Sequence, residues 1–368
     1  MKKKNLCKTL LKTMCIVLGI LILALLAYIV YLYASYYRIE DNQELVVEAP
    51  VDDTTTGAAA VLATDTEYSA VTYNIGFGAY LPDYSFFMDG GTSSWAESPE
   101  TVQYAINGAG ELVKSLDPDF ALIQEIDLDA TRSYHTDEYE MLRNILPEYT
   151  TVFAQNYDSA FLFYPFTQPH GSSRAGLGLF SKYPVSSALR RSFPISTSFS
   201  KFFDLDRCYS VSRIPVDNGK ELVIFNLHMS AYGNSDEIRK GQIEMLCNDM
   251  AKEYEAGNYV LCGGDFNHDL KASEEDTESC ESWAFPFPRT ELPEHFAFCL
   301  DLLSSEEQAA LWNSARNADM EYVPGVTYTV TLDGFIISDN IECRSYENVN
   351  TGYSYSDHDP VKMEFVLK

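Results

Sequence analysis

The sequence predicts a mixed α/β domain in which two stacked β-sheets are covered by helices, preceded by one membrane-spanning helix. Two observations lead to this fold class. Short apolar runs alternate with amphipathic stretches over roughly the last 300 residues, which is typical of a sheet sandwich with helices on its outer faces. Near the start of the chain, by contrast, a long apolar stretch from Thr13 to Tyr37 carries no charged residue.

The chain begins with five lysines among residues 1–12, which predicts a basic cytoplasmic segment. Residues 13–37 are predicted to form a transmembrane helix, because a bilayer span needs roughly 20 apolar residues. Tyrosines crowd its far end, as at a membrane interface, and acidic residues follow, so the rest of the chain is expected outside the cell. A cleaved signal peptide is the alternative, although no clean small-x-small site precedes Ala34.

The chain beyond this helix is strongly acidic. All 54 acidic residues follow Ile39, whereas six of the 26 basic residues precede it, which leaves the later part with a net charge of −34. Such a surface repels polyanions unless a metal ion or a basic patch intervenes. Residues 38–66 are acidic and rich in Thr and Ala, which predicts an extracellular linker, and residues 67–368 suffice for one domain.

Six cysteines lie beyond the helix. Cys280 and Cys299 flank a Pro-rich loop and are the candidates for a disulfide in an oxidising compartment. Cys262 lies inside an apolar strand and is typical of a core residue. No Cys-x-x-Cys spacing occurs, so a structural zinc site is not expected.

The elements of the domain follow from periodicity and end signals. One helix has Ser98 as its cap and Pro99 at its first position. Strands are predicted at 68–75, 119–125, 149–154, 174–181, 207–215, 221–228, 258–264, 333–338, 341–347 and 360–367. Helices are predicted at 99–115, 137–146, 235–255 and 304–316.

Polar residues stand at the ends of several apolar runs. In chain order they are Asn74, Glu125, His228, Asp265, Asn267, Asp333, Asp357 and His358. Polar side chains at the ends of buried strands converge on one edge of a sandwich, where a site can form. Carboxylates, amides and imidazoles in this combination suit metal-assisted attack of water on a phosphate ester.

This order of motifs resembles the endonuclease/exonuclease/phosphatase family, the DNase-I-like phosphoesterases, over roughly residues 68–368. The resemblance implies a four-layer α/β/β/α sandwich and a metal-dependent phosphoric ester hydrolase. It also implies that Glu125 and Asp357 bind the divalent cation, Mg²⁺ or alternatively Mn²⁺, which prefers hard oxygen ligands. Read without the resemblance, Glu125 could equally be a solvated carboxylate at a strand end.

The resemblance assigns Asp265 to orienting or deprotonating the attacking water and Asn267 to a non-bridging phosphate oxygen. Asn74 would lie beside the metal. Each of these residues is also compatible with a simple turn, since an Asx-turn often closes a strand. His228 would contact the scissile phosphate or the leaving group, although a lone His at a strand end is more often structural.

In the family an Asp at a strand start pairs with the final His, and Asp333 and His358 match those positions. The pairing would fix the tautomer of the imidazole and keep it cationic near the phosphate. This chain departs from the family pattern around Asp333. Leu332 precedes it and Gly334 follows it, where family members commonly carry a basic residue before the strand and an aromatic residue after the Asp.

Three further residues, Arg174, Arg132 and His135, are candidates for a phosphate or substrate rim, and each is equally compatible with a loop surface or a salt bridge. The loop at 77–97 is long and aromatic and follows directly on Asn74. Such a loop beside a site is usually functional or ordered by packing. Its aromatic residues have no core periodicity, so we expect them to form a lid, to stack on a base or sugar, or to contact lipid.

The sequence therefore predicts a single-pass protein of a bacterial plasma membrane with an extracellular Mg²⁺-dependent phosphoesterase domain. The substrate is a phosphodiester or phosphomonoester, lipid-derived or small, and no protein partner is evident. An extracellular nuclease is the first alternative. It is disfavoured because a nuclease needs a basic groove to bind its polyanionic substrate, and basic residues are scarce in a domain with a net charge of −34. A catalytically silent binding module on the same fold is the second, and the intact motif set argues against it.

Overall fold

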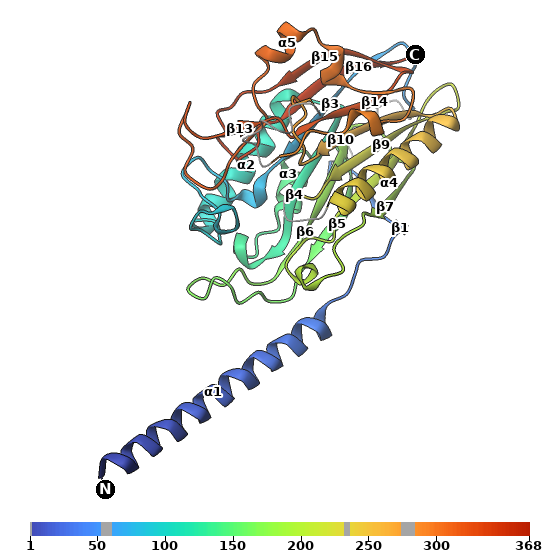
Figure 1. Cartoon of the computed structure of the whole chain (residues 1–368). Coiled ribbons are helices and arrows are strands. Elements are labelled where there is room, and N and C mark those ends of the chain that lie inside the picture. Colours follow the sequence, from blue (N-terminus) through green and yellow to red (C-terminus); the bar gives the residue numbers. More distant parts are fainter. Residues whose placement is uncertain (1, 53–60, 232–235, 274–283) are drawn as a thin grey trace. The chain divides into compact units, whose positions relative to one another are not determined.

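The computed structural model describes residues 2–52, 61–231, 236–273 and 284–368. The chain divides into two compact units, one ending at Arg38 and one beginning at Ile39. The first unit is the helix α1 (Lys2–Ser35), whose stretch Leu6–Ser35 is long and apolar enough to cross a membrane (Figure 1). Its length and apolar composition are those of a membrane span, and signal sequences share both properties.

The described part of the second unit contains two seven-stranded sheets. The first sheet has the order β1 (Gln43–Glu44), β7 (Ser187–Ser192), β8 (Cys208–Pro215), β9 (Glu221–His228), β10 (Tyr259–Asp265), β14 (Asp333–Ser338) and β11 (Phe296–Phe298). The second has the order β15 (Ile341–Asn348), β16 (Val361–Leu367), β3 (Glu67–Asn74), β4 (Phe120–Ala130), β6 (Ser173–Ser181), β5 (Thr150–Asp158) and β2 (Val47–Glu48). A short pair, β12 (Ala315–Arg316) and β13 (Thr329–Val330), lies apart from both.

Helices cover the outer faces of both sheets (Figure 1). The helices α2 (Pro99–Leu116) and α3 (Glu138–Ile145) pack against the second sheet, and α4 (Asp236–Glu255) packs against the first. The remaining helices of the described residues are α5 (Ser305–Ala310) and the 3₁₀ turns η2 (Gly76–Gly78), η3 (Phe87–Asp89), η4 (Thr131–Ser133), η5 (Phe199–Phe202), η7 (Arg289–Glu291) and η8 (Cys299–Leu302). The four-layer α/β/β/α fold class predicted from the sequence is confirmed.

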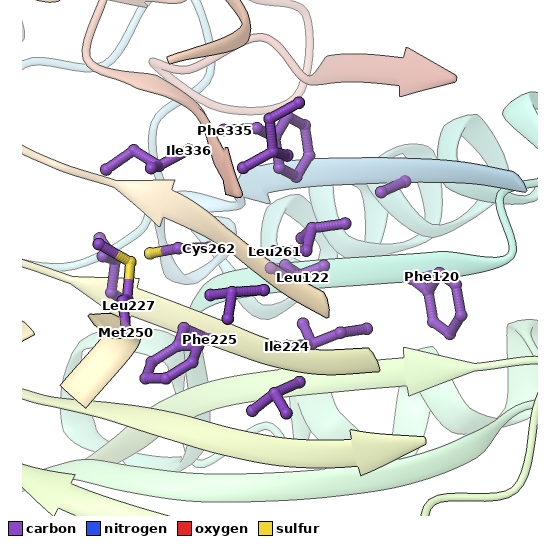
Figure 2. Packing of buried hydrophobic residues seen from close by; sticks show 14 of the residues in the cluster. Phe120, Leu122, Ile224, Phe225, Leu227, Met250, Leu261, Cys262, Phe335 and Ile336 are labelled. Atoms are coloured by element: carbon purple, nitrogen blue, oxygen red, sulfur yellow. The ribbon is translucent and has the colours of Figure 1, made fainter. Parts of the chain in front are cut away.

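The core lies between the two sheets, where inward-facing residues of every second position meet. Figure 2 shows Leu122 of β4 packed with Ile224 of β9 and Leu261 of β10, all of them fully buried. Residues at the alternate positions face the helices instead, and Met250 of α4 lies next to Cys262 (Figure 2). Because both faces of the central strands are covered, β9 and β10 are apolar almost throughout.

The expected helix at 304–316 is wrong in length. A capping box between Ser304 and Glu307 starts α5, but the chain is already extended at Leu311. Asn313 and Ser314 then turn their side chains toward Thr329 and Asp333, which gives this segment a different set of partners from a helix.

Strand β7 was not expected, because its sequence SALRRS is polar. Its central residue, Arg190, is nevertheless fully buried. The guanidinium donates to the carbonyl oxygens of Gln155, Glu40 and Asp206, at 2.7, 3.2 and 2.9 Å. A buried cation is tolerated here because these acceptors satisfy its donors.

The expectation of a free linker over residues 38–66 also needs correction for the residues that the structure describes. β1 pairs with β7 at the edge of the first sheet, and β2 pairs with β5 at the edge of the second. Leu62 is fully buried and forms a bridge with Val216. The physical reason is that edge strands expose unpaired backbone groups, which this segment satisfies on both sheets.

Cys280, one half of the expected disulfide, lies outside the described residues. Cys299 is buried and neighbours Cys343 of β15, whose pKa is lowered by a hydrogen bond from the Cys299 thiol. Both are free thiols in the structure.

Candidate active site

Strand register brings the polar strand ends together at one edge of the sandwich. β3 and β4 are parallel, with Asn74 beside Gln124. β9 and β10 are parallel, with His228 beside Asp265, and β14 runs antiparallel with Asp333 beside Asp265. Three side chains from three neighbouring strands therefore share one face, and they point toward the opposite sheet, which carries Asn74.

Glu125 reaches this site only because β4 is irregular. A bulge separates the pairing of Ile123 from that of Ile126, and Glu125 between them has φ +55°. In a regular strand Gln124 and Glu125 would point to opposite faces. The bulge and the left-handed backbone turn the carboxylate back toward Asn74, at a conformational cost of about 1–2 kcal/mol. Strain of this kind is concentrated at functional sites.

Asn74 holds two carboxylates in place. Its Nδ2 donates to Glu125 Oε1 and to Asp265 Oδ2, each at 3.0 Å, and its Oδ1 accepts from the backbone N–H of Gly76. Gly76 has φ +55°, and a Cβ there would lie 3.2 Å from Asp357 Oδ1. The glycine thus lets the turn after β3 pass close beside Asp357.

A buried polar cluster lies beneath the site and was not expected from the sequence. Gln124 Nε2 donates to Thr72 Oγ1 at 3.1 Å and, across to the other sheet, to Asn226 Oδ1 at 2.8 Å. Asn226 donates in turn to the carbonyl oxygen of Gly178. Gln124 and Asn226 are one and two residues before Glu125 and His228, so this cluster ties together the strands that carry those side chains.

His358 is paired with Asp333, since its Nδ1 lies 2.7 Å from Asp333 Oδ2. The same carboxylate oxygen accepts from Ser314 Oγ. Burial opposes charge on His358, but the carboxylates of Asp333, Asp265 and Asp357 outweigh it and raise the pKa of His358 well above its usual value. The imidazole is therefore cationic and presents Nε2 toward Asp265 Oδ2, 3.8 Å away.

His228 has the opposite electrostatics. Its Nε2 lies 3.5 Å from Asp265 Oδ2 and 3.9 Å from Glu125 Oε1. Burial, together with the positive charges of Arg207 and His358, lowers the pKa of His228 well below its usual value. One neutral and one cationic imidazole thus flank the same carboxylate oxygen.

Burial raises the pKa of two acids of the site, Asp265 and Asp357. Burial and the negative charge of Asp333 raise the pKa of Asp265 to about 7, although the positive charge of His358 acts in the other direction. Burial and the nearby Glu125 raise the pKa of Asp357 to about 6, although His358 and Arg316 act in the other direction.

These acids fit a divalent cation. Among the described residues no Lys or Arg lies within 4.0 Å of the carboxylates of Glu125 or Asp357. Asp265, Asp333 and His358 also have ligand atoms within 4.8 Å of one another, but the shortest of these contacts is the hydrogen bond between Asp333 and His358. Glu125 and Asp357 both line the cavity, and their carboxylates are hard oxygen donors of the kind that suits Mg²⁺ or Mn²⁺.

The site opens into a cavity of about 580 Å³. Polar groups line the cavity, including Asn267, whose amide also donates to the carbonyl oxygen of Met229. Aromatic side chains line it as well. These are Phe77, Tyr80, Phe86, Tyr157, His170 and Phe203. A cavity lined by both polar and aromatic groups can hold a phosphate ester together with a larger group attached to it.

The loop at 77–97 is packed differently from the expectation. Tyr80, Tyr84 and Phe86 are buried and join a cluster around Phe77, where their rings meet edge to face. These aromatic residues show no periodicity along the chain because the loop wraps around itself through the turns η2 and η3. Met88, at the tip, stays half exposed and lines the cavity.

The three rim candidates separate into two groups. Arg132 is buried, forms an ion pair with Asp127 at 2.9 Å and stacks 3.7 Å above the Phe77 ring, and it lines the cavity. Arg174 and His135 are exposed, both pair with Asp129, and neither lines the cavity. The contacts of Arg174 and His135 with Asp129 on the surface therefore account for these two residues better than a role in binding substrate.

Two further arginines line the cavity and were not expected from the sequence. Arg207 is buried at the start of β8, and its Nε and Nη1 have no hydrogen-bond partner among the described residues. Arg316 donates to the carbonyl oxygens of Tyr80 and Leu81 and so fixes the loop after η2. Neither stands in a motif; only the structure brings them to the cavity.

Residues 71–302, more than half of the chain, match the Endonuclease/Exonuclease/phosphatase family. The chain belongs to this family, whose members are hydrolases of the phosphoesterase and nuclease type. No curated protein sequence matches.

Solved structures with the same fold come from several organisms. A family protein from Bacteroides vulgatus is 17% identical with a TM-score of 0.53, and the match covers 83% of this chain and 100% of that one. D. rerio TDP2 in complex with a single-strand DNA product is 14% identical with a TM-score of 0.53, covering 82% and 99%. The human Nocturnin catalytic domain with a bound sulfate anion is 15% identical with a TM-score of 0.52, covering 82% and 94%. Likenesses at this level establish the fold.

Proposed function

We propose that the protein is a divalent-metal-dependent phosphoesterase, anchored in the plasma membrane by α1, with its catalytic domain outside the cell. The observation that carries this proposal is that Glu125, Asp265 and His358 line one cavity, where hydrogen bonds to Asn74 and Asp333 hold them. The substrate class is a phosphodiester or phosphomonoester that is lipid-derived or small. An acidic, outward-facing domain on a short anchor fits such substrates better than a polyanion.

Glu125 and Asp357 would hold the cation. When bound, a Mg²⁺ or Mn²⁺ ion supplies positive charge that polarises the phosphate and stabilises the leaving oxygen. Asn74 keeps Glu125 and Asp265 in a fixed relation to each other through the two bonds of its Nδ2. A ligand set arranged before substrate arrives avoids the cost of reorganisation during the reaction.

Asp265 would orient the attacking water and accept its proton on Oδ2. The pKa of Asp265, raised to about 7 chiefly by burial, suits a group that takes up a proton near neutral pH. The cationic His358, held by Asp333, would face the charge that develops on the phosphate. The neutral His228 and the remaining amide proton of Asn267 would donate to phosphate oxygens, and the buried guanidinium of Arg207 offers further charge-assisted donors.

A nuclease remains the alternative within the enzyme class. Two structural neighbours were solved with anionic ligands, a single-strand DNA product and a sulfate, which supports a phosphate group as the ligand. The net charge of −34 beyond the helix argues against a long nucleic acid. A silent binding module would have no use for the strained backbone at Glu125.

The test uses the full chain in detergent or lipid. It is incubated with Mg²⁺, Mn²⁺ or excess chelator and assayed on bis-p-nitrophenyl phosphate, DNA and choline phospholipids. Hydrolysis is expected only with a divalent cation. Asp265→Asn and His358→Ala should each lower kcat by at least ~10²-fold, the scale of general bases and charge-stabilising groups. Full activity in chelator would refute the metal requirement, and DNA as the preferred substrate would favour the nuclease.

A further inference from the structure

Three aromatic side chains protrude from the loop that joins β5 to β6. Phe163, Tyr164 and Phe166 are 50%, 63% and 86% exposed. No Asp, Glu, Lys or Arg occurs from Ser159 to Ser173, although the chain as a whole carries a net charge of −28. Exposed apolar patches of this kind usually mark contact with a protein or a membrane.

A second loop, between β7 and β8, adds to the same surface. Phe199 and Phe203 are 49% and 38% exposed, and their rings lie 5.5 Å apart. Phe203 lines the cavity together with Met88. The first loop joins this surface through Tyr164, whose ring lies 5.9 Å from that of Phe87, the neighbour of Met88. Figure 1 draws both loops at the same end of the domain.

We call these exposed residues the aromatic rim. Its members are Met88, Phe163, Tyr164, Phe166, Phe199 and Phe203. Because Met88 and Phe203 both line the cavity and are partly exposed, the rim borders the cavity mouth.

The chain enters the domain beside this rim. The backbone N–H of Ile39 donates to Asp206 Oδ2 at 2.6 Å, and Asp206 belongs to the loop that carries Phe199 and Phe203. Only Tyr36, Tyr37 and Arg38 separate Ile39 from Ser35, the last residue of α1. A segment of this length spans at most about 14 Å. The loop that carries Phe199 and Phe203 therefore contacts the first residue of the domain, which only three residues of the chain separate from α1.

We propose that the aromatic rim inserts into the interface of the membrane that holds α1, so that the cavity opens at the lipid surface. Aromatic side chains favour the headgroup level, where their apolar bodies leave water. A charge-free loop avoids the cost of carrying ionised groups into that layer. If the proposed function holds, a lipid-borne phosphate ester can reach the catalytic groups without leaving the membrane, and this last step alone rests on it.

The test places a fluorescent reporter in the rim of the full-length protein. Phe166→Trp is reconstituted into phosphatidylcholine vesicles with and without brominated acyl chains, and the emission of the parent protein is subtracted. Insertion predicts that the added tryptophan loses about half of its emission or more to the brominated lipid. The matched control is Leu302→Trp in η8, a position 56% exposed and outside the rim, which should lose little.

Phe163→Trp repeats the measurement at a second rim position, in case Phe166→Trp disturbs its loop. Absence of lipid quenching at both positions would overturn the proposal. Protection from aqueous acrylamide without lipid quenching would also overturn it, since a second copy or another protein would then cover the rim. Fluorescence requires no hydrolysis, so this result is independent of whether the domain is an active phosphoesterase.

Discussion

Asp333 Oδ2 lies 2.7 Å from His358 Nδ1, and the pair is buried at the junction of β14 with the segment before β16. The relationship decides the charge of the site, because burial alone would leave His358 neutral, whereas the neighbouring carboxylates raise its pKa. Because Nδ1 of His358 is bonded to Asp333, only Nε2 is available to contact a ligand.

Replacing Asp333 with asparagine should therefore weaken activity and change its pH dependence. The raised pKa keeps His358 protonated at neutral pH, and the protonated form is lost only as the pH rises through that value. In the Asp333→Asn protein the pKa of His358 falls, so we expect the alkaline limb of kcat/KM to move down by about one pH unit or more. The pH–rate profile of the two proteins measures this shift.

The surface provides a matched control for that variant. His295 and Asp339 form a pair with the same 2.7 Å separation, but both are exposed. Asp339→Asn should leave the pH–rate profile unchanged. An unshifted profile in Asp333→Asn, with the fold intact, would show that the charge of His358 is not used in the reaction.

Glu125→Gln should weaken divalent-cation binding by about 10-fold or more, because it removes one of the two carboxylates proposed to hold the cation while keeping the shape of the side chain. Isothermal titration with Mn²⁺ measures this without any turnover. Glu140→Gln on α3 is the control, since Glu140 is exposed and pairs with Arg143. Equal Mn²⁺ affinity in parent and Glu125→Gln would place the cation elsewhere.

The loop at 77–97 should affect substrate choice through its tip and stability through its buried part. Met88→Ala removes a side chain that lines the cavity but is half exposed. We expect it to change the ratio of kcat/KM for a large and a small diester while the protein remains stable. Phe86→Ala, by contrast, should destabilise the fold by about 3–5 kcal/mol. An unchanged ratio in a folded Met88→Ala protein would reject a role in specificity.

The membrane arrangement has its own test. External protease on intact cells should remove the domain and leave a small N-terminal fragment in the membrane. This follows from the five lysines before the apolar stretch and the acidic residues after it. Recovery of a soluble form that begins near Ala34 or Ser35 would identify the stretch as a signal peptide.

Cys299 and Cys343 should form a disulfide if the domain is exported. The Cys299 side chain lowers the pKa of Cys343, so the two thiols are neighbours, and an oxidising exterior allows such neighbours to pair. Alkylation of the unfolded, non-reduced protein followed by mass spectrometry counts the free thiols, and buried Cys208 serves as the internal control that stays reduced. Full alkylation of both residues in protein taken from cells would contradict export or pairing.

Particular elements show how far the sequence alone could lead. The capped helix α2 and the apolar strand β9 were predictable, because local signals and burial on both faces leave clear patterns. The order of polar strand ends led to the family, which residues 71–302 confirm. The pairing of β1 and β2 with the sheet edges was not predictable, since two-residue strands carry no periodicity.

The amino-acid sequence was sufficient to predict the components of this protein: an apolar helix, a sandwich of strands and helices, and the polar residues that end its strands. Tertiary structure alone decided how they meet. The bulge at Glu125 reverses the direction that strand alternation would give its carboxylate. Arg207 reaches the cavity, and Arg174 turns to Asp129 instead. Composition and spacing along the chain specify which functional groups are present. The direction of each side chain, and the distances between the groups, depend on strand register, backbone turns and packing between residues far apart in the chain.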